Sequence, residues 1–251
     1  MEELIEGVCS SMKLLDKEKA GILITEDDTA ELRMRSGRCL VGRIMSERKI
    51  QKEAFRTLMA RLWKTFGDVA FKELDVNLWL IEFSNGDDKR RVLEGRPWLF
   101  DRNILVLKEV VEDVAPVQMD FSKSLFWIQV HDMPLICMNR EVGYKIGATI
   151  GVVEEVDVTG EGVVWGRCLR IRVEVDITKP LERGCVLDLN GKPVWVSFRY
   201  EKLPYFCHFC GRIVHDKESC DGKRGFRQNA GDSSRQWGSW LQADDLRSHK
   251  G

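Results

Sequence analysis

Three cysteines and one histidine near the carboxyl end of the chain follow the spacing C-x2-C-x4-H-x4-C: Cys207, Cys210, His215 and Cys220. A two-residue gap between cysteines lets one tight turn deliver two thiolates to the same metal ion, and zinc takes four nitrogen or sulfur ligands in a tetrahedron. Gly211 directly follows the second cysteine, where the chain must turn sharply. The spacing predicts one structural zinc ion, because four protein ligands leave no open position for a reacting water.

The side chains around these four residues are aromatic and basic. Residues 199–227 contain seven basic and four acidic side chains. We interpret His208 as a surface aromatic, since its ring would have to fold back to reach the metal. The candidate nucleic-acid contacts are three rings that could stack on bases and four basic side chains that could bind phosphates, namely Phe206, His208, Phe209, Arg212, Lys217, Lys223 and Arg224.

Two simpler interpretations stay open. The four ligands could fall at this spacing by chance in a surface loop, and the local excess of basic residues could be the ordinary fluctuation of a solvated surface. The whole chain of 251 residues has a formal net charge of −1. That balance counts against a polybasic protein that holds nucleic acid by phosphate contacts alone.

The other five cysteines are scattered along the chain: Cys9, Cys39, Cys137, Cys168 and Cys185. Their spread is typical of reduced thiols in an intracellular protein rather than of a secreted disulfide scaffold. The first residues are acidic, and no run approaches the roughly 18 apolar residues of a membrane-spanning helix. We therefore expect an intracellular protein, nuclear or cytoplasmic, without a signal peptide or membrane anchor.

Residues 1–33 are predicted to form a flexible leader, and strand and helix signals then alternate over residues 34–115. Apolar residues recur at steps of three and four along residues 51–66, as on one face of a helix. The predicted elements are a strand at 39–45, a helix at 51–66, strands at 69–74 and 77–83, a helix at 87–93 and a strand at 104–107. This βαββαβ order is the plan of an RRM-like (ferredoxin-like) α+β domain.

A second, strand-rich α+β unit is predicted over residues 116–203. Its elements are a strand at 125–130, a helix at 141–150, strands at 152–158 and 168–177, a short helix at 179–183, and strands at 186–189 and 194–200. Asn190 and Gly191, between the last two strands, are a strong hairpin signal. The order partly repeats the first unit, so a diverged duplication and a single larger α+β domain both fit.

Side-chain alternation separates the two faces of the strand at 77–83. Trp79, Ile81 and Phe83 share one face, and Leu78 and Leu80 lie on the other. We predict that Trp79 and Phe83 belong to the core, because large aromatics are usually buried. The RRM-like unit is then expected to lack the outward aromatics with which such domains read RNA.

Two arginines alternate with apolar residues on the strand at 168–177. Arg170 and Arg172 could hold phosphates or stack on bases. They could equally pair with Glu174 or Asp176 on a solvated sheet, and this second interpretation is favoured.

Five runs carry a resemblance when they are taken with the four metal ligands: LEGRPWLFD (93–101), FWIQVHDMP (126–134), DITKPLERG (176–184), FRYEKLP (198–204) and QWGSWL (236–241). The chain resembles the plant retrotransposon-associated family that joins a domain of unknown function to a CCHC zinc knuckle of the CX2CX4HX4C type. The resemblance implies a gag-like or first-reading-frame protein of a non-LTR element, or a domesticated copy, that binds nucleic acid through the knuckle.

On this resemblance, residues 204–222 are the zinc knuckle and residues 223–251 are a flexible tail. Related elements can carry an endonuclease and a reverse transcriptase after such a region, and neither is expected in this chain. Retroviral-type knuckles have an aromatic residue, a glycine and an apolar residue where this chain has His208, Val214 and Asp216. Phe206, Phe209 and Ile213 would have to supply the stacking platform instead.

The leading hypothesis is non-enzymatic, zinc-dependent binding of single-stranded RNA or DNA. The alternative is a protein–protein interaction module or homo-oligomer that uses the sheet face with Leu78 and Leu80, the zinc knuckle serving as a rigid clip. No enzyme is expected, because no nucleophile elbow, phosphate loop or open metal site accompanies the pair His131 and Asp132.

Overall fold

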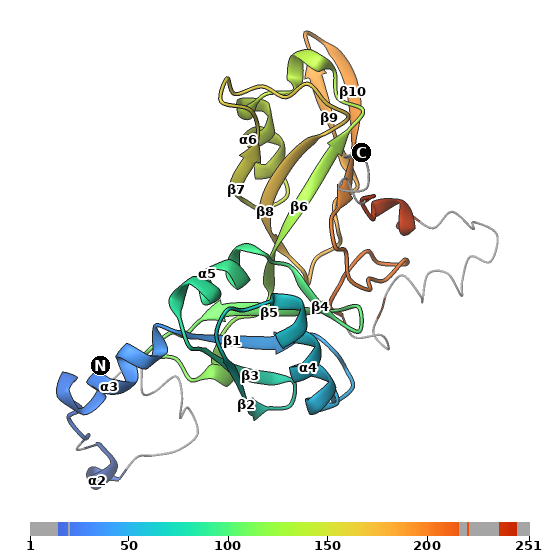
Figure 1. The fold of residues 1–251 in the computed structure, drawn as a ribbon. Helices are drawn as coiled ribbons and strands as arrows, with labels where there is room; N and C mark the ends of the chain where they lie inside the picture. The colour runs from blue at the N-terminus through green and yellow to red at the C-terminus, as the bar shows by residue number, and fades with distance from the viewer. Residues whose placement is uncertain (1–14, 20, 216–219, 221–235, 245–251) are drawn as a thin grey trace. The chain divides into compact units, whose positions relative to one another are not determined.

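The computed structural model describes residues 15–19, 21–215, 220 and 236–244 (Figure 1). The chain divides into two compact units, residues 1–35 and residues 36–251. Among the residues described, no helix combines the length and the apolar character that crossing a bilayer requires.

In the described part of the predicted leader and just beyond it lie the helices α2 (Asp16–Lys19) and α3 (Glu26–Ser36). The sequence of α3 lacks the apolar periodicity by which a helix is recognised, and accordingly none of its residues is buried. Its start is capped instead, since the Thr25 N–H donates to Asp28 Oδ2 at 2.9 Å and the Asp28 N–H donates to Thr25 Oγ1 at 3.4 Å. Arg33 and Arg35 lie in its last turn, where positive charge favours a helix.

The second unit begins with the predicted RRM-like domain. Its elements are β1 (Cys39–Ile44), α4 (Lys52–Trp63), β2 (Val69–Asp75), β3 (Leu78–Phe83), α5 (Gly86–Glu94), β4 (Trp98–Phe100) and β5 (Asn103–Glu109). The strands form an antiparallel sheet in the order β2-β3-β1-β5-β4. The α+β, RRM-like fold is therefore as predicted. Only the three-residue β4 was missed; it is joined to β5 by a tight turn in which Asp101 and Arg102 both have positive φ.

The two faces of β3 lie in two different cores. Trp79 and Phe83 are 2% and 1% exposed and pack with Phe55 and Trp63 of α4, which confirms their core assignment. Leu78, on the opposite face, is fully buried in a second core that contains residues of the other sheet, and Leu80 packs against that core. The interaction hypothesis is therefore wrong in its choice of surface, because the chain itself covers the face with Leu78 and Leu80.

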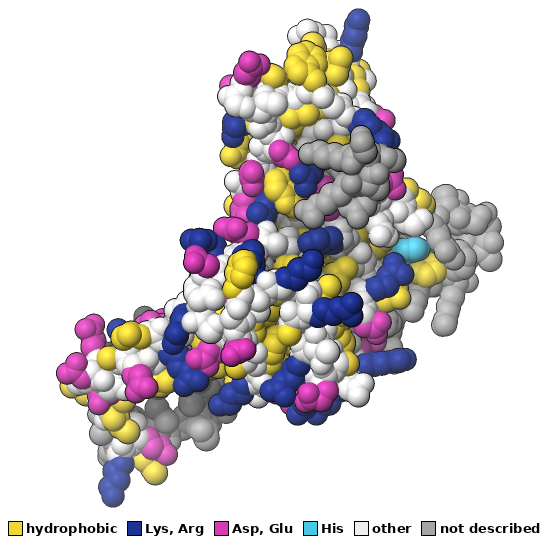
Figure 2. All heavy atoms as spheres, in the orientation of Figure 1, with side chains coloured by type: hydrophobic (Ala, Val, Ile, Leu, Met, Phe, Trp, Pro, Cys, Tyr) yellow, Lys and Arg dark blue, Asp and Glu magenta, His cyan; other side chains and the backbone are white. Residues whose placement is uncertain are grey.

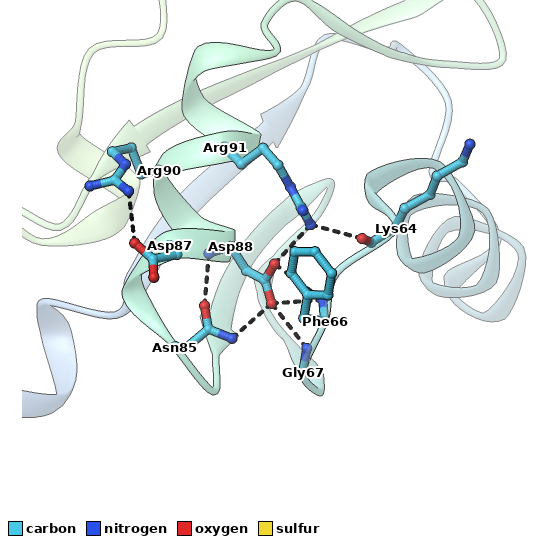
Figure 3. Close-up of polar contacts among 8 residues, drawn as sticks. All are labelled: Lys64, Phe66, Gly67, Asn85, Asp87, Asp88, Arg90 and Arg91. Carbon is cyan, nitrogen blue, oxygen red and sulfur yellow. Dashed lines mark hydrogen bonds and ion pairs between the residues drawn. The ribbon is translucent and has the colours of Figure 1, made fainter.

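A buried carboxylate ties α5 to the loop between α4 and β2 (Figure 3). Asp88 Oδ2 accepts hydrogen bonds from the backbone N–H groups of Phe66 and Gly67, both at 3.0 Å, and from Asn85 Nδ2 at 2.9 Å. Arg91 Nη2 donates to Asp88 Oδ1 at 2.8 Å, and Asn85 caps α5 by accepting from the Asp88 N–H. Burial raises the pKa of Asp88, but the hydrogen bonds from Gly67, Phe66 and Asn85 and the charge of Arg91 outweigh it, so the pKa lies below its ordinary value.

We expect Asp88→Asn to lower the thermal midpoint by about 5 °C at neutral pH, because the amide turns an N–H group toward two backbone donors. The folded-state pKa of Asp88 is depressed, so its contribution is complete above the unfolded-state value near 4 and is lost as the pH falls through the folded-state value. Thermal melts at falling pH should show the wild type approaching the variant below about pH 4. A constant difference would contradict this account, and the exposed neighbour Asp87→Asn is the control.

A second antiparallel sheet follows after η1 (Pro116–Gln118). Its elements are β6 (Lys123–His131), η2 (Leu135–Cys137), α6 (Arg140–Ala148), β7 (Val152–Asp157), β8 (Leu169–Asp176), β9 (Gly184–Leu189) and β10 (Lys192–Tyr200). The strand order is β7-β8-β6-β10-β9. Every pairing of the first sheet has its counterpart in the second, in the same chain order. This repeated topology favours the diverged duplication.

The short helix predicted at 179–183 is not formed. In the chain order of the first sheet α5 occupies this position, but here residues 177–183 are a turn and an extended loop. The Asp176 carboxylate accepts hydrogen bonds from the N–H and the hydroxyl of Thr178, which fixes a turn. Pro180 follows and cannot supply a helical N–H. Loop 177–183 replaces the second helix of the repeat.

Of the predicted tail, residues 223–251, the structure describes residues 236–244. A short helix, η3 (Ser239–Leu241), places Leu241 in the second core with no exposed surface. The Ala243 N–H donates to the Tyr200 carbonyl at 3.0 Å, beside a parallel bridge between Tyr200 and Gln242. These residues close one side of the second sheet's core.

Candidate nucleic-acid interface at the zinc knuckle

The four predicted metal ligands converge. The ligand atoms of Cys207, Cys210, His215 and Cys220 all lie within 4.8 Å of one another. The Sγ atoms of Cys207 and Cys220 are 3.8 Å apart, which is too long for a disulfide. A tetrahedron with Zn–S bonds of about 2.3 Å has edges of about 3.8 Å. The cluster therefore fits one structural zinc ion, as the spacing predicted.

A tight turn brings the first two ligands together. The Gly211 N–H donates to the Cys207 carbonyl at 2.7 Å, and the Cys207 N–H donates to the Arg212 carbonyl at 2.9 Å. Gly211 has φ +74°, and a Cβ atom there would lie 2.4 Å from the Trp237 ring. Glycine is therefore required at this position both by the backbone conformation and by the neighbouring indole.

Burial, with the neighbouring thiols Cys207 and Cys220, raises the pKa of Cys210 to about 11 in the absence of metal. A thiol with this pKa is neutral at pH 7. Zinc binds the thiolate, so metal binding must displace the proton of Cys210.

The knuckle is fastened to loop 177–183. The Leu181 N–H donates to the Gly211 carbonyl at 2.9 Å, and the Val214 N–H donates to the Ile177 carbonyl at 3.0 Å. Trp237 completes the junction, because its Nε1 donates to the Leu181 carbonyl at 2.8 Å. The loop that replaces a helix thus holds the knuckle and the returning segment 236–244 in place.

A groove of about 910 Å³ separates the knuckle from the end of the first sheet. Residues 204–209 and 213–215 form the knuckle wall, and residues 43–47, 76–77 and 102–104 form the opposite wall. Asn77 stiffens that wall, because its buried side chain donates to the carbonyls of Ser46 and Arg48 and accepts from the Ile50 N–H. Both walls are therefore built from firmly held segments.

Aromatic rings and arginines meet at the rim of the groove. Tyr205 is 55% exposed, and the guanidinium of Arg102 lies 4.3 Å from its ring centroid. The Tyr205 N–H also donates to the Arg102 carbonyl at 2.9 Å, which joins the two walls. The rings of Phe206 and His208 lie 4.9 Å apart on the knuckle side. Figure 2 shows Lys and Arg side chains over α4 and around β4, interleaved with acidic and hydrophobic ones; neither α4 nor β4 lines the groove.

The predicted contact residues fall into three groups. Phe206, His208 and Phe209 are half-buried and line the groove. Arg212 is half-buried and does not line it. Lys217, Lys223 and Arg224 lie outside the described residues.

Arg43, Arg102 and Tyr205 also line the groove and were not among the predicted nucleic-acid contacts. Arg102 and Tyr205 are about a hundred positions apart in the chain, so only the fold brings them together. The aromatic character of Tyr205 next to the knuckle was the one available signal.

Arg170 and Arg172 are engaged in ion pairs, as the favoured interpretation held, although with other partners. Arg170 binds the Glu201 carboxylate through Nε at 2.8 Å and Nη2 at 3.0 Å, and it also pairs with Asp157. Arg172 donates to the Glu94 carbonyl at 2.6 Å and lies 3.6 Å from Glu154. Asp157 and Glu154 lie on the adjacent strand β7, whereas Glu201 follows β10, on the far side of β6.

Two stretches of the chain match known families. Residues 34–118 match a domain of unknown function (DUF4283), and residues 175–222 match a zinc knuckle. The second match begins before loop 177–183, so it includes the loop to which the knuckle is fastened.

An uncharacterized protein of Arabidopsis thaliana is 27% identical over 135 residues, which cover 53% of this chain and 42% of that protein. The chain therefore spans less than half the length of this relative. Among solved structures, the Caenorhabditis elegans NONO-1 homodimer matches with 14% identity and a TM-score of 0.25, over 81% of this chain and 76% of that one. The first two RRM domains of yeast Pub1 match with 13% identity and a TM-score of 0.23, over 65% of this chain and 98% of that one. TM-scores of this size do not establish a shared fold.

Proposed function

We propose that this chain, with its DUF4283 domain and its zinc knuckle, binds single-stranded nucleic acid in the groove between the knuckle and the first sheet. The observation that carries the proposal is the meeting of rings and arginines at this groove: Tyr205, Phe206 and Phe209 face Arg43 and Arg102. Unpaired bases stack on aromatic side chains, and arginines bind the phosphates between them. Zinc would act structurally, by holding the aromatic wall in place.

The charges of the groove indicate that stacking contributes more than phosphate contacts. Among the residues that the structure describes, Arg43 and Arg102 are the arginines of the groove and Glu47 is its acidic lining residue. A zinc dication with three thiolates adds a net charge of −1, so the metal centre itself does not attract phosphates. Binding should therefore tolerate many sequences, since every base offers a ring face.

The finer role that we propose is gag-like and non-enzymatic. The union of the DUF4283 domain with a zinc knuckle supports the retrotransposon-derived origin that the resemblance implies. A sequence-tolerant binder suits a protein that coats the transcript of its own element. The ligand could be RNA or DNA, since stacking and phosphate contacts serve both.

Fluorescence anisotropy with a labelled single-stranded RNA tests the proposal. We expect binding by the zinc-loaded protein that is weakened at least about tenfold by a chelator, since structural zinc sites fold only with their metal. Two phosphate contacts predict that log K falls with log salt with a slope of about −1.4 or steeper. Equal affinity with and without zinc would refute the role of the metal, and an absence of binding in both states would refute nucleic-acid binding.

A further inference from the structure

The second sheet has an open face that the proposed function does not use. Along β10, Val196, Phe198 and Tyr200 are buried in the core, so the alternating residues Trp195 and Arg199 point to the opposite face. α6 lies on the core side, because a Cβ atom on its glycines would touch core residues of β7 and β8. In RRM-like domains the sheet face away from the helices is the one that reads single strands.

A groove of about 560 Å³ lies on this open face. Its lining includes Trp195 and Arg199 of β10 together with Arg183, Gln236 and Trp240. The returning segment 236–244 thus supplies part of a site as well as part of the core.

The indoles of Trp195 and Trp240 are half exposed to solvent, and each packs against a glycine. Trp195 is 52% exposed and Trp240 is 55% exposed. Each indole packs on a glycine, since a Cβ atom at Gly184 would lie 2.5 Å from the Trp195 ring and one at Gly238 would lie 2.1 Å from the Trp240 ring. Two immobilised rings that keep half of their surface in solvent are suited to stacking against a flat ligand.

The arginines beside these rings can accept an anion. Arg183 lies over the Trp237 ring at 5.3 Å and donates to the Gln236 carbonyl at 3.4 Å, which leaves other guanidinium N–H groups on an exposed side chain. Arg199 is 3.3 Å from the Asp244 carboxylate, whose side chain is 85% exposed. Exposed ion pairs of this kind are weak, so a phosphate can take the place of the carboxylate.

We propose that Trp195, Trp240, Arg183 and Arg199 form a second site for unpaired nucleotides, in which a base stacks on an indole and its phosphate binds an arginine. The pairing of flat aromatic surface with guanidinium groups fits nucleotides better than a purely apolar or a purely anionic partner. The inference rests on the proposed function in taking the same class of ligand, but it uses residues that the knuckle groove does not contain.

The test compares variants of the full, zinc-loaded chain in anisotropy titrations with a labelled single-stranded RNA. Trp195→Ala combined with Trp240→Ala should weaken binding at least about tenfold. Trp165→Ala, which removes a tryptophan that is 76% exposed outside the groove, should leave binding unchanged. Asp244→Asn should tighten binding by about twofold to threefold, because it removes the carboxylate that competes for Arg199. Unchanged affinity in the double tryptophan variant would overturn the proposal.

Further variants protect the test against misfolding and separate the two sites. Arg199→Gln keeps both indoles, so its loss of affinity at an unchanged melting temperature would support the site even if the double variant unfolds. If Tyr205→Ala weakens binding and the double tryptophan variant does not, this inference fails and the proposed function stands. If only the double tryptophan variant weakens binding, the knuckle groove is refuted as a binding site and this site stands. An oligoglutamate peptide that bound here as tightly as the RNA would assign the groove to an acidic protein partner and overturn the nucleotide site.

Discussion

Replacing Cys207 by serine should release the zinc ion and weaken the binding of single-stranded nucleic acid by at least about tenfold. Cys207 contributes a ligand to the cluster of four and closes the turn through its hydrogen bonds with Gly211 and Arg212. Structural zinc contributes about 10–16 kcal/mol of apparent binding free energy in isolated fingers, so the knuckle should not stay folded without it. The aromatic wall of the groove, which includes Phe206 and Phe209, would be lost with the knuckle.

Zinc content per chain, measured by mass spectrometry, and anisotropy titrations on the same samples check this result. Cys185→Ser is the matched control, because Cys185 is a partly buried thiol outside the metal cluster. We expect one zinc ion per chain in the wild type and the control and close to none in Cys207→Ser. A Cys207→Ser protein that keeps its zinc and its affinity would refute the ligand assignment.

Tyr205→Ala should weaken nucleic-acid binding by about tenfold while leaving the zinc content unchanged. Loss of one base–aromatic stack costs about 1–3 kcal/mol, and 1.4 kcal/mol corresponds to a factor of ten. The ring of Tyr205 is more than half exposed at the rim of the groove, and it also positions Arg102 by a cation–π contact. Removal of the ring should therefore disturb both stacking and one phosphate contact.

Tyr205→Phe keeps the ring and should bind like the wild type. Arg102→Ala should reduce the dependence of log K on log salt by about 0.7, which is the contribution of one phosphate contact on a single strand. Arg90→Ala is its control, because Arg90 is an exposed arginine of α5 that pairs with Asp87. If Tyr205→Ala and Tyr205→Phe bound alike, the stacking role of this residue would be excluded.

Local patterns predicted most of the fold because each was decided by its own residues. Alternation along β3 put Trp79 and Phe83 on one face, and the usual burial of large aromatics assigned them to the core. Asn190 and Gly191 marked the hairpin between β9 and β10. The spacing of four residues was enough to predict the metal cluster, since the ligands of a knuckle are close in sequence.

Other parts could not be predicted because their causes are not local. The groove needs Arg102 and Tyr205, which meet only after two sheets have formed. Loop 177–183 occupies the position that a helix has in the first sheet's chain order. It is held instead by hydrogen bonds with Gly211 and Trp237, which come later in the chain. α3 was not predicted although its stabilising contacts are local. It has no apolar stripe, the pattern by which most helices are recognised, and its cap and terminal charges stabilise it instead.

The return of residues 236–244 to the second sheet has a consequence for the order in which the protein folds on the ribosome. All strands of the first sheet lie before residue 110, so this domain can fold soon after it emerges. The second sheet cannot be completed at that stage, since Leu241 fills its core and Ala243 pairs with Tyr200. We therefore expect part of its apolar interior to stay exposed in the nascent chain until synthesis has passed the zinc ligands and reached residues 236–244.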